Sequence, residues 1–320
     1  MEERNGYDIF TFGEAMALFM TTDTDSVATA STYAMTAAGA EGNVAVAATR
    51  LGLNVYFQTK LGRDQLGDAV ASQFEAAGVA SKHFLRVDNY TGALVRNHGA
   101  TNPLENTYLR RCSAASTFEP SDIDVEILGG SRWLHVTGIT VALSDTSKRA
   151  VDFALDVARK NKVGISFDLN IRRKLWSPEQ ARRTLSEMVK DVDLVTGGVD
   201  EYELVFGSKD PEENLKSVAA RGVKTVIMTA GPDEMRILHE GEQFNFTPQK
   251  VKVVDPVGSG DAFISGTISG LLAGLDIRQA IAQGSKCGAM VASTMGDWAG
   301  MVAGSNGLLP NGEFDGKNGE

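Results

Sequence analysis

The chain has 320 residues, 42% of them hydrophobic and 22% charged, which is enough to bury a sizeable core. Its formal net charge of −10 argues against nucleic-acid binding, which normally needs a basic face. The two cysteines and four histidines are scattered without disulfide or zinc-ligand spacing, and both cysteines are expected to be small buried residues.

The N-terminal stretch MEERNGYDIF is charged and has no apolar signal core. The most apolar run, residues 262–275, is interrupted by Gly and Ser. It is also shorter than the about 20 residues that a membrane span takes. We therefore expect a soluble, cytoplasmic protein with no membrane segment.

The first third of the chain does not alternate strands and helices. Residues 8–13 predict a strand, residues 14–37 are rich in Thr and Ala without helical period, and residues 38–51 predict a helix of small residues. Further along, residues 90–113 predict extended segments around the loop GATNPLEN. Strands inserted into an α/β core in this way are expected to form a lid over the site.

From about residue 131 the pattern changes to strands alternating with amphipathic helices. WLHVTGIT predicts a strand before a helix over residues 148–160, and VGISFDLN predicts a strand before a helix capped by Ser177. DLVTGG and KTVIMTAG predict two more strands, with a helix near residues 200–206 after the first. This alternation predicts a parallel sheet covered on both faces.

Ligands of open parallel sheets bind at the carboxyl ends of the strands. The residues expected there are mostly small or polar, so they can converge on one crevice. They are Gly13–Glu14, Asp168–Asn170, Thr196–Gly198, Thr229–Gly231 and Asp255–Asp261.

The stretch DPVGSGDAF, residues 255–263, combines a glycine turn with an acid. Gly258, Ser259 and Gly260 precede a helix expected from Ala262, and the free N–H groups of such a turn favour an anion. Asp261 lies at the same place and, taken alone, could be an ordinary N-cap. A Walker P-loop, a dinucleotide fingerprint, protein-kinase signatures and a G-x-S-x-G elbow are all absent from the sequence.

DPVGSGDAF resembles the D-T-x-G-A-G-D-x-F signature of the ribokinase-like (phosphofructokinase-B-type) carbohydrate kinases. AGAEGNVAVAATRLG, followed by KLGRDQLGD, is similar to the other signature of that family, and the resemblance covers the chain to about Asp297. It implies an α/β ribokinase-like three-layer sandwich with a mostly parallel central sheet and a small β-strand lid. It implies one kinase domain over residues 1–320. The break in the alternation predicts lid strands inserted at 11–37 and 90–113, and the Gly- and Asn-rich tail at 304–320 is expected to be disordered.

The resemblance also implies roles for the glycine turn and its acid. Asp261 would be the general base that accepts the proton of the sugar hydroxyl. Gly258, Ser259 and Gly260 would form an anion hole for the transferred phosphoryl group. The implied cofactors are ATP and Mg²⁺, with a monovalent cation such as K⁺ near Asp255 left open. Besides the turn, the implied nucleotide-binding residues are Asn170, Arg172, Thr229 and Gly231, and Glu201 would hold Mg²⁺ through water.

Three segments are similar to 2-keto-3-deoxygluconate kinases in particular: TYLRRCSAAS resembles Y-Y-R-x-G-S-A-A-S, FDLNIRRKLW resembles F-D-x-N-x-R-x-x-L-W, and AGAEGN resembles G-A-E-x-N. The implied sugar-binding residues are Gly39, Asn43, Tyr108, Arg110, Arg172, Asp261 and Asp297. A sugar acid carries a carboxylate that neutral sugars lack, and Arg110 offers a planar donor fork for it. Structural alternatives stay open: surface arginines at Arg110 and Arg172, a packing Tyr108, a helix-capping Asn43 and a plain turn residue at Asp297.

Two motifs depart from the family pattern. The usual N-x-x-E reads from Gly198 to Glu201, so the Asn is lost, and the usual K-x-G-x-x-G reads from Thr229 to Glu234, so the Lys and second Gly are lost. A kinase of a neutral sugar and a degenerate kinase acting as a sensor therefore stay open as alternatives. The retained Asp261 favours an enzyme, and a homodimer that covers the lid edges is expected.

Overall fold

Residues 6–301 are described by the computed structural model of the chain. Their contacts divide them into two compact units. The first unit contains the chain up to Thr11 together with Phe118–Lys250, and the second contains Phe12–Thr117 together with the chain from Val251. The expectation of a single domain over the whole chain stays a prediction.

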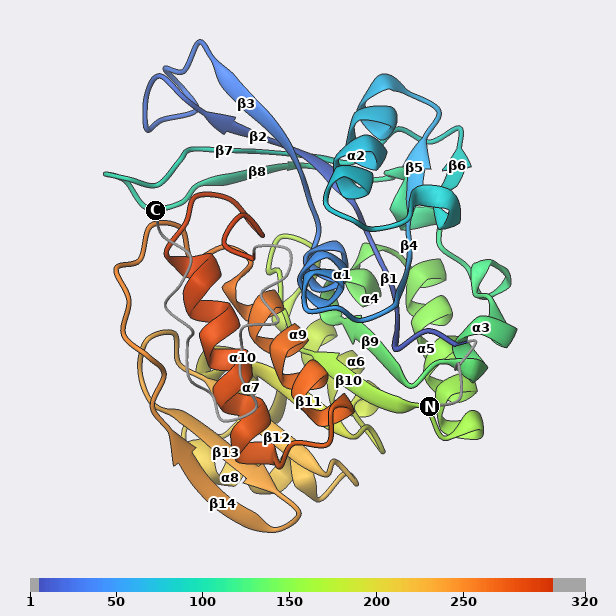
Figure 1. Cartoon of the computed structure of the whole chain (residues 1–320), viewed down its shortest axis with the longest axis vertical. Coiled ribbons are helices and arrows are strands. Elements are labelled where there is room, and N and C mark those ends of the chain that lie inside the picture. The colour runs from blue at the N-terminus through green and yellow to red at the C-terminus, as the bar shows by residue number, and fades with distance from the viewer. Residues whose placement is uncertain (1–5, 302–320) are drawn as a thin grey trace. The chain divides into compact units, whose positions relative to one another are not determined.

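The first unit is built on a mostly parallel sheet with the strand order β14-β13-β12-β11-β10-β9-β1 (Figure 1). Strands β1 and β9 to β12 are parallel, and β13 and β14 complete the edge as an antiparallel hairpin. Most residues of β9 to β12 are buried, as expected of parallel strands covered on both faces. The strands are β1 (Ile9–Phe12), β9 (Trp133–Thr137), β10 (Gly164–Asp168), β11 (Leu194–Gly198), β12 (Thr225–Thr229), β13 (Met235–His239) and β14 (Glu242–Phe246).

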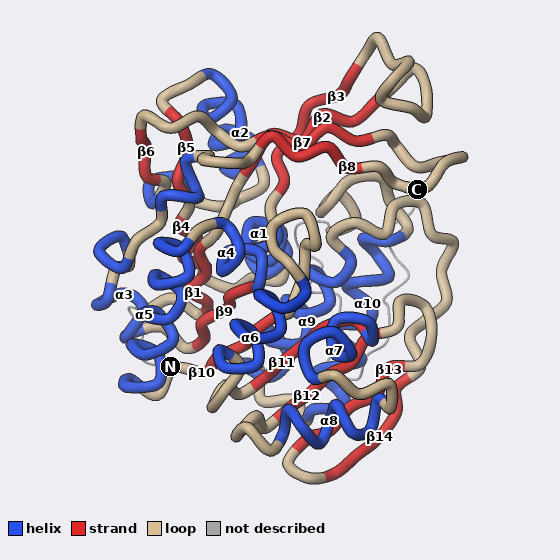
Figure 2. Tube along the Cα trace, turned by 180° about the vertical axis from the view of Figure 1, so that it is seen from behind, coloured by secondary structure: helices blue, strands red, loops and turns tan. Residues whose placement is uncertain are grey.

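The helices of the first unit connect strands that follow one another in both chain and sheet. Right-handed crossovers in a constant direction place them on one face, and Figure 2 shows α5 to α8 on the same side of the strands. Helix α6 begins with the predicted Ser177 cap, which is half of a capping box with Gln180. The helices are α3 (Val125–Gly130), α4 (Gly138–Leu143), α5 (Asp145–Asn161), α6 (Pro178–Met188), α7 (Val199–Phe206) and α8 (Pro211–Ala219).

The second unit contains a four-stranded sheet and four α-helices among the described residues. Its sheet has the order β3-β2-β7-β8, formed by β2 (Met16–Thr21), β3 (Tyr33–Ala38), β7 (Ala93–Arg96) and β8 (Asn106–Leu109). These strands lie in the two ranges from which a lid is expected, although β3 ends one residue beyond the first range, at Ala38. The remaining elements are β4 (Val55–Gln58), the parallel pair β5 (Lys60–Gly62) and β6 (Leu85–Val87), α1 (Ala40–Arg50), α2 (Gln65–Ala76), α9 (Ser259–Leu272) and α10 (Ile277–Ala292).

Helices α9 and α10 lie side by side in both views (Figures 1 and 2). Small residues make this close approach possible, because a Cβ on Gly266 would come within 2.8 Å of both the Cys287 Sγ and the Gly284 Cα. Helix α1 also packs against α9, where the Ser265 Oγ donates to the Val44 carbonyl at 3.2 Å. Residues 262–270 of the Gly- and Ser-studded run are therefore buried in α9. None of the described helices is long and apolar enough to cross a membrane.

Three expectations about local structure are wrong. WLHVTGIT is not one strand, because β9 ends at Thr137, whose hydroxyl accepts the Ile139 N–H and starts α4. Helix α9 begins at Ser259 rather than Ala262, so Asp261 lies inside its first turn and is not the cap. Of the two cysteines, Cys287 is buried as expected but Cys112 is exposed. The tail at 304–320 lies outside the described residues.

Candidate active site

The glycine turn of DPVGSGDAF is the N-terminus of α9. Gly258 is the N-cap residue with a φ of 79°, a left-handed conformation that favours glycine, and no side chain caps this helix. A Cβ at Gly258 would lie 1.9 Å from the Asp297 carbonyl oxygen, so the turn rests directly on that segment. A Cβ at Gly260 would meet nothing within 4 Å. The turn is thus tightly packed on one side and open at Gly260.

Asp261 is held by a residue from the other signature motif. The Asn43 Nδ2 donates to the Asp261 Oδ2 at 2.7 Å, and only 4% of Asn43 and 8% of Asp261 are exposed. Asn43 lies in the first turn of α1, behind the N-cap Gly39, and is therefore not the cap of that helix. The structure brings together two predicted residues that are 218 positions apart, with the acid oriented by an amide.

Asp297, whose predicted role is to contact sugar, is buried beside two other charged residues. Burial raises the pKa of Asp297 to about 6, with Asp255 adding to the rise and Arg96 and a hydrogen bond from Asn43 opposing it. The usual pKa of such a carboxyl is 3.8, so between about pH 4 and pH 6 the folded protein holds a proton that the unfolded chain releases. The free energy of unfolding therefore falls as the pH rises through this window.

We expect Asp297→Asn to remove this pH dependence. Because a shift of one pKa unit corresponds to about 1.4 kcal/mol, the stability of the variant relative to the natural protein should rise on the order of 2–3 kcal/mol from pH 4 to pH 7. Urea unfolding at a series of pH values measures this difference. Asp88→Asn, at a side chain that is 97% exposed, is the control and should give a curve parallel to the natural protein. A constant difference for Asp297→Asn would contradict the expectation.

Arg110 is not a surface arginine. Its side chain is 5% exposed and forms an ion pair with Glu14, which is 1% exposed. Glu14 also accepts the Ser113 hydroxyl at 2.6 Å, and the Arg110 guanidinium carbon lies 5.1 Å from the centroid of the Tyr108 ring. The Arg110 Nε is buried and has no hydrogen-bond acceptor among the described residues. A buried donor of this kind normally has a partner, so this edge of the guanidinium suits an incoming acceptor.

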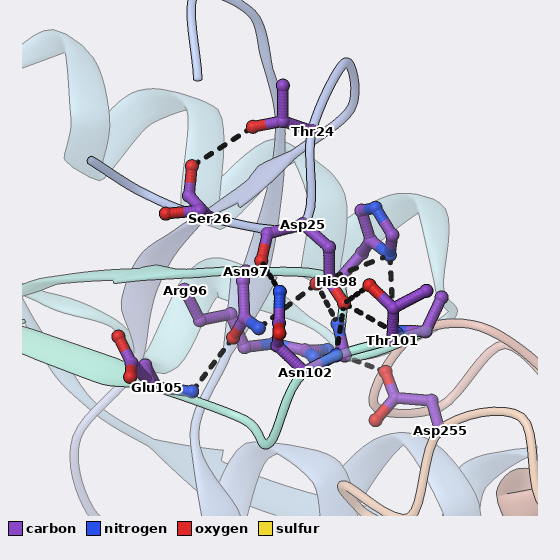
Figure 3. A network of polar contacts seen from close by, with 12 residues as sticks. Thr24, Asp25, Ser26, Arg96, Asn97, His98, Thr101, Asn102, Glu105 and Asp255 are labelled. Atoms are coloured by element: carbon purple, nitrogen blue, oxygen red, sulfur yellow. Dashed lines mark hydrogen bonds and ion pairs between the residues drawn. The ribbon is translucent and has the colours of Figure 1, made fainter. Parts of the chain in front are cut away.

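Two loops of the four-stranded sheet are joined to each other by Asp25 (Figure 3). Its carboxylate accepts the N–H groups of Gly99, Thr101 and Asn102 at 2.6–2.7 Å, and the Asn97 Nδ2 at 3.0 Å. Burial opposes the charge, but the N–H groups of Thr101, Asn102 and Gly99 hold the pKa of Asp25 well below its usual range. The β2–β3 loop is therefore joined to the β7–β8 loop around one carboxylate.

In the first unit, the polar residues that follow β10 and β11 form a separate cluster. Asn170, with a φ of 33°, donates its backbone N–H and its Nδ2 to the two oxygens of Asp168, at 3.2 and 3.1 Å. Burial raises the pKa of Asp168 to about 7, Glu201 adds to the rise, and Arg172 opposes it. The structure thus places Asn170, Arg172 and Glu201 around one half-buried carboxylate, Asp168, which the sequence predicts only as one of the polar residues at the strand ends.

Glu201 accepts hydrogen bonds from backbone N–H groups in the same cluster. Its two carboxylate oxygens accept the N–H groups of Ile171 and Gly198. Among the described residues no group of three or more His, Cys, Asp and Glu side chains could hold a metal ion. Thr229 ends β12 and donates to the Gly197 carbonyl at 3.1 Å, while a Cβ at Gly231 would meet nothing within 4 Å.

The sequence predicts no role for Arg96, only a place at a strand end for Glu14, and only a possible cation near Asp255. Glu14 follows a predicted strand, which is a signal for the edge of a sheet but not for an ion pair with Arg110. Arg96 has no sequence signal, because its acidic partner Asp255 lies 159 positions away. Only the folded chain shows these pairs.

The chain as a whole is similar to known proteins. A family model described as pfkB family carbohydrate kinase matches residues 7–302. The chain is 34% identical to a 2-dehydro-3-deoxygluconokinase of Bacillus subtilis over 92% of both chains. It is 31% identical to a 2-dehydro-3-deoxygalactonokinase of Haloferax volcanii over 91% of this chain and 93% of that one. The crystal structure of a 2-dehydro-3-deoxygluconokinase from Thermotoga maritima matches 95% of this chain and 99% of its own, with a TM-score of 0.86 and 28% identity.

Proposed function

Because the chain belongs to the pfkB family of carbohydrate kinases, we propose that it phosphorylates a sugar acid with ATP as the donor. Family membership confirms the predicted ribokinase-like α/β fold and the kinase class. The proposed substrate is 2-keto-3-deoxygluconate (2-dehydro-3-deoxygluconate), converted to its 6-phosphate. Support comes from two similar proteins that are named as kinases of sugar acids of this type.

The observation that carries the substrate class is the buried donor edge of Arg110. A guanidinium presents five N–H donors, and its pairing with Glu14 leaves the Nε without an acceptor in the part of the chain that the structure describes. A substrate carboxylate would supply that acceptor and form a charge-assisted hydrogen bond. A neutral sugar has only uncharged oxygen acceptors, which bind less strongly to a cation.

Asp261 is proposed as the general base. It would take the proton of the sugar hydroxyl while that oxygen attacks the phosphoryl group, and the Asn43 amide at 2.7 Å would hold the carboxylate in one orientation. The turn from Gly258 to Gly260 would donate N–H groups to the charge that develops on the phosphoryl oxygens. Gly39, Tyr108, Arg172 and Asp297 complete the proposed sugar-binding residues, and Asn170, Arg172, Thr229 and Gly231 the nucleotide-binding ones.

Asp168 and Glu201 fit Mg²⁺ as a partner. Each is a carboxylate, hard oxygen ligands suit this ion, and the repulsion that helps to raise the pKa of Asp168 would be relieved by a cation. Each carboxylate oxygen of Glu201 has a second lone pair beside its bond to a backbone N–H, which a water bound to the metal could use. When bound, Mg²⁺ would neutralise charge on the phosphates of ATP. The homodimer stays a prediction.

The test is a panel of sugars and sugar acids with Arg110 variants. A charge-assisted hydrogen bond contributes about 1.5–3 kcal/mol, so Arg110→Ala should raise KM for the keto-deoxy acid roughly 10- to 100-fold. Arg110→Lys should recover only part of this, because it lacks the planar fork. Initial rates of ATP consumption give kcat and KM. Arg111→Ala, at the exposed neighbouring arginine, is the control.

Two outcomes would replace this proposal with a kinase of neutral sugars. One is natural protein that phosphorylates fructose or ribose as well as the acid. The other is an Arg110→Ala variant that weakens acids and neutral sugars equally. If no sugar stimulates ATP consumption, the sensor alternative takes its place.

A further inference from the structure

Arg96 is a buried cation between two buried acids. It ends β7 with 1% of its side chain exposed, and its Nη2 lies 2.6 Å from the Asp255 Oδ2 and 3.7 Å from the Asp297 Oδ1. The side chains of Asp255 and Asp297 are 0% and 5% exposed. Figure 3 shows Arg96 directed at Asp255 from β7, the strand that leads into the β7–β8 loop. No step of the proposed chemistry uses this arginine.

The carboxylate of Asp255 links Arg96 to the glycine turn and to the segment that packs against it. Its Oδ1 accepts the Val257 N–H at 3.1 Å, directly before Gly258. Its Oδ2 accepts the Gly296 N–H at 3.2 Å, directly before Asp297, whose carbonyl packs against Gly258. One carboxylate thus fixes the turn before α9 and the turn after α10.

A buried carboxylate in this position requires a positive charge, because an uncompensated charge in the interior is strongly unfavourable. A bound metal ion could supply it, but it would need several oxygen ligands with spare lone pairs. The described side chains around Asp255 offer mainly unpaired donors rather than spare oxygen ligands. The Nε and Nη1 of Arg96 are buried donors without an acceptor, whereas of the carboxylate oxygens of Asp255 and Asp297 only the Asp297 Oδ1 is buried without a donor among the described residues.

We propose that Arg96 is the permanent counter-cation of Asp255 and Asp297 and a positioning residue for the turn Gly258–Asp261, so that this turn keeps its shape without a bound monovalent metal ion. The guanidinium supplies the positive charge that a K⁺ ion near Asp255, left open by the sequence, would otherwise supply. Its effect on turnover rests on the proposed kinase function. Its effect on folding and on cation binding does not.

The first experiment uses the natural protein in K⁺, Na⁺ and choline chloride at equal ionic strength. We expect melting temperatures to agree within about 1 °C, and turnover of the sugar acid to agree within about twofold, since no ion binds the folded state preferentially. A saturable rise of the melting temperature or of turnover with K⁺ would overturn the proposal. If no sugar is turned over, the proposed function fails, and the melting temperatures still decide this inference.

The second experiment removes the built-in charge. Arg96→Gln should lose turnover by about tenfold or more and should melt lower, because Asp255 loses its charge-assisted partner. Guanidinium at millimolar concentration, or K⁺, should restore both properties in a saturable way, and Arg96→Lys should retain both without added cation. Arg86→Gln is the matched control, because Arg86 also pairs with an acid, Asp68 at 3.0 Å, and with a backbone carbonyl.

The proposal is wrong if Arg96→Gln melts and turns over like the natural protein. It is also wrong if no cation restores Arg96→Gln while Arg96→Lys is equally impaired, since a packing role alone would give that result. Should Arg96→Gln not fold, Arg96→Lys and Asp255→Asn decide between the outcomes. Asp255→Asn should lower turnover with no response to any cation, because the carboxylate that the cation would serve is gone.

Discussion

Asp261→Asn is expected to lower kcat by about 10²- to 10⁴-fold while sugar binding stays measurable, because the variant has no general base. The fold should survive the change. The amide oxygen of the new Asn can accept the Asn43 Nδ2 in place of the carboxylate, and Asn is tolerated in the first turn of a helix. Single-turnover phosphorylation and calorimetric titration with the sugar acid separate the two effects.

The matched control for this change is Asp276→Asn. Asp276 is also a carboxylate at a helix N-terminus, where it caps α10 by accepting the Gln279 N–H at 2.9 Å. The same exchange there should leave turnover unchanged. Turnover of Asp261→Asn near that of the natural protein would mean that another group removes the proton from the sugar hydroxyl.

Gly260→Val is expected to lose activity but not stability, whereas Gly258→Ala is expected to lose stability. A side chain at Gly260 meets no protein atom within 4 Å, so Gly260→Val should melt like the natural protein. It should nevertheless lose turnover by more than about 10²-fold, because the side chain occupies the space where the turn would donate to the phosphoryl group. Gly258→Ala should instead lose at least about 2 kcal/mol of stability, owing to its positive φ and the 1.9 Å approach to the Asp297 carbonyl.

Thermal melting and initial rates on both glycine variants make the comparison. The pair distinguishes a ligand-facing position from a structural one within the same turn. A fully active Gly260→Val would place the transferred phosphoryl group elsewhere. A Gly258→Ala variant as stable as the natural protein would show that the turn can shift away from Asp297.

Local patterns predict much of the fold, because caps and apolar periods act over a few residues. Ser177 and Pro178 start α6 as expected, and the alternation after residue 131 gives a parallel sheet. The same reasoning fails at Gly138, where β-branched neighbours resemble a strand but a Thr137 cap begins α4. It also fails to show that Gly260 is open, since the space around a turn depends on distant segments.

In the candidate site, too, the sequence predicts some residues and not others. The family motifs predict Asn43 and Asp261 as site residues, and the structure shows that the two are hydrogen-bonded to each other. The partners of the arginines could not be predicted, because an ion pair such as Arg96 with Asp255 leaves no periodic trace in the chain. Arg110 is an example. The sequence identifies it as a candidate for binding a carboxylate, but only the structure shows that its guanidinium already forms an ion pair with Glu14.

The exposure of Cys112 makes the chain suited to selective labelling. The sequence has two cysteines, and Cys287 is buried, so a maleimide dye should attach at one position of the folded protein. Cys112 has a φ of 59° and stands where the similar sugar-acid kinase segment has Gly, so its side chain projects from a turn that normally carries none. A fluorophore there, two residues beyond Arg110, would report ligand arrival optically in the natural sequence.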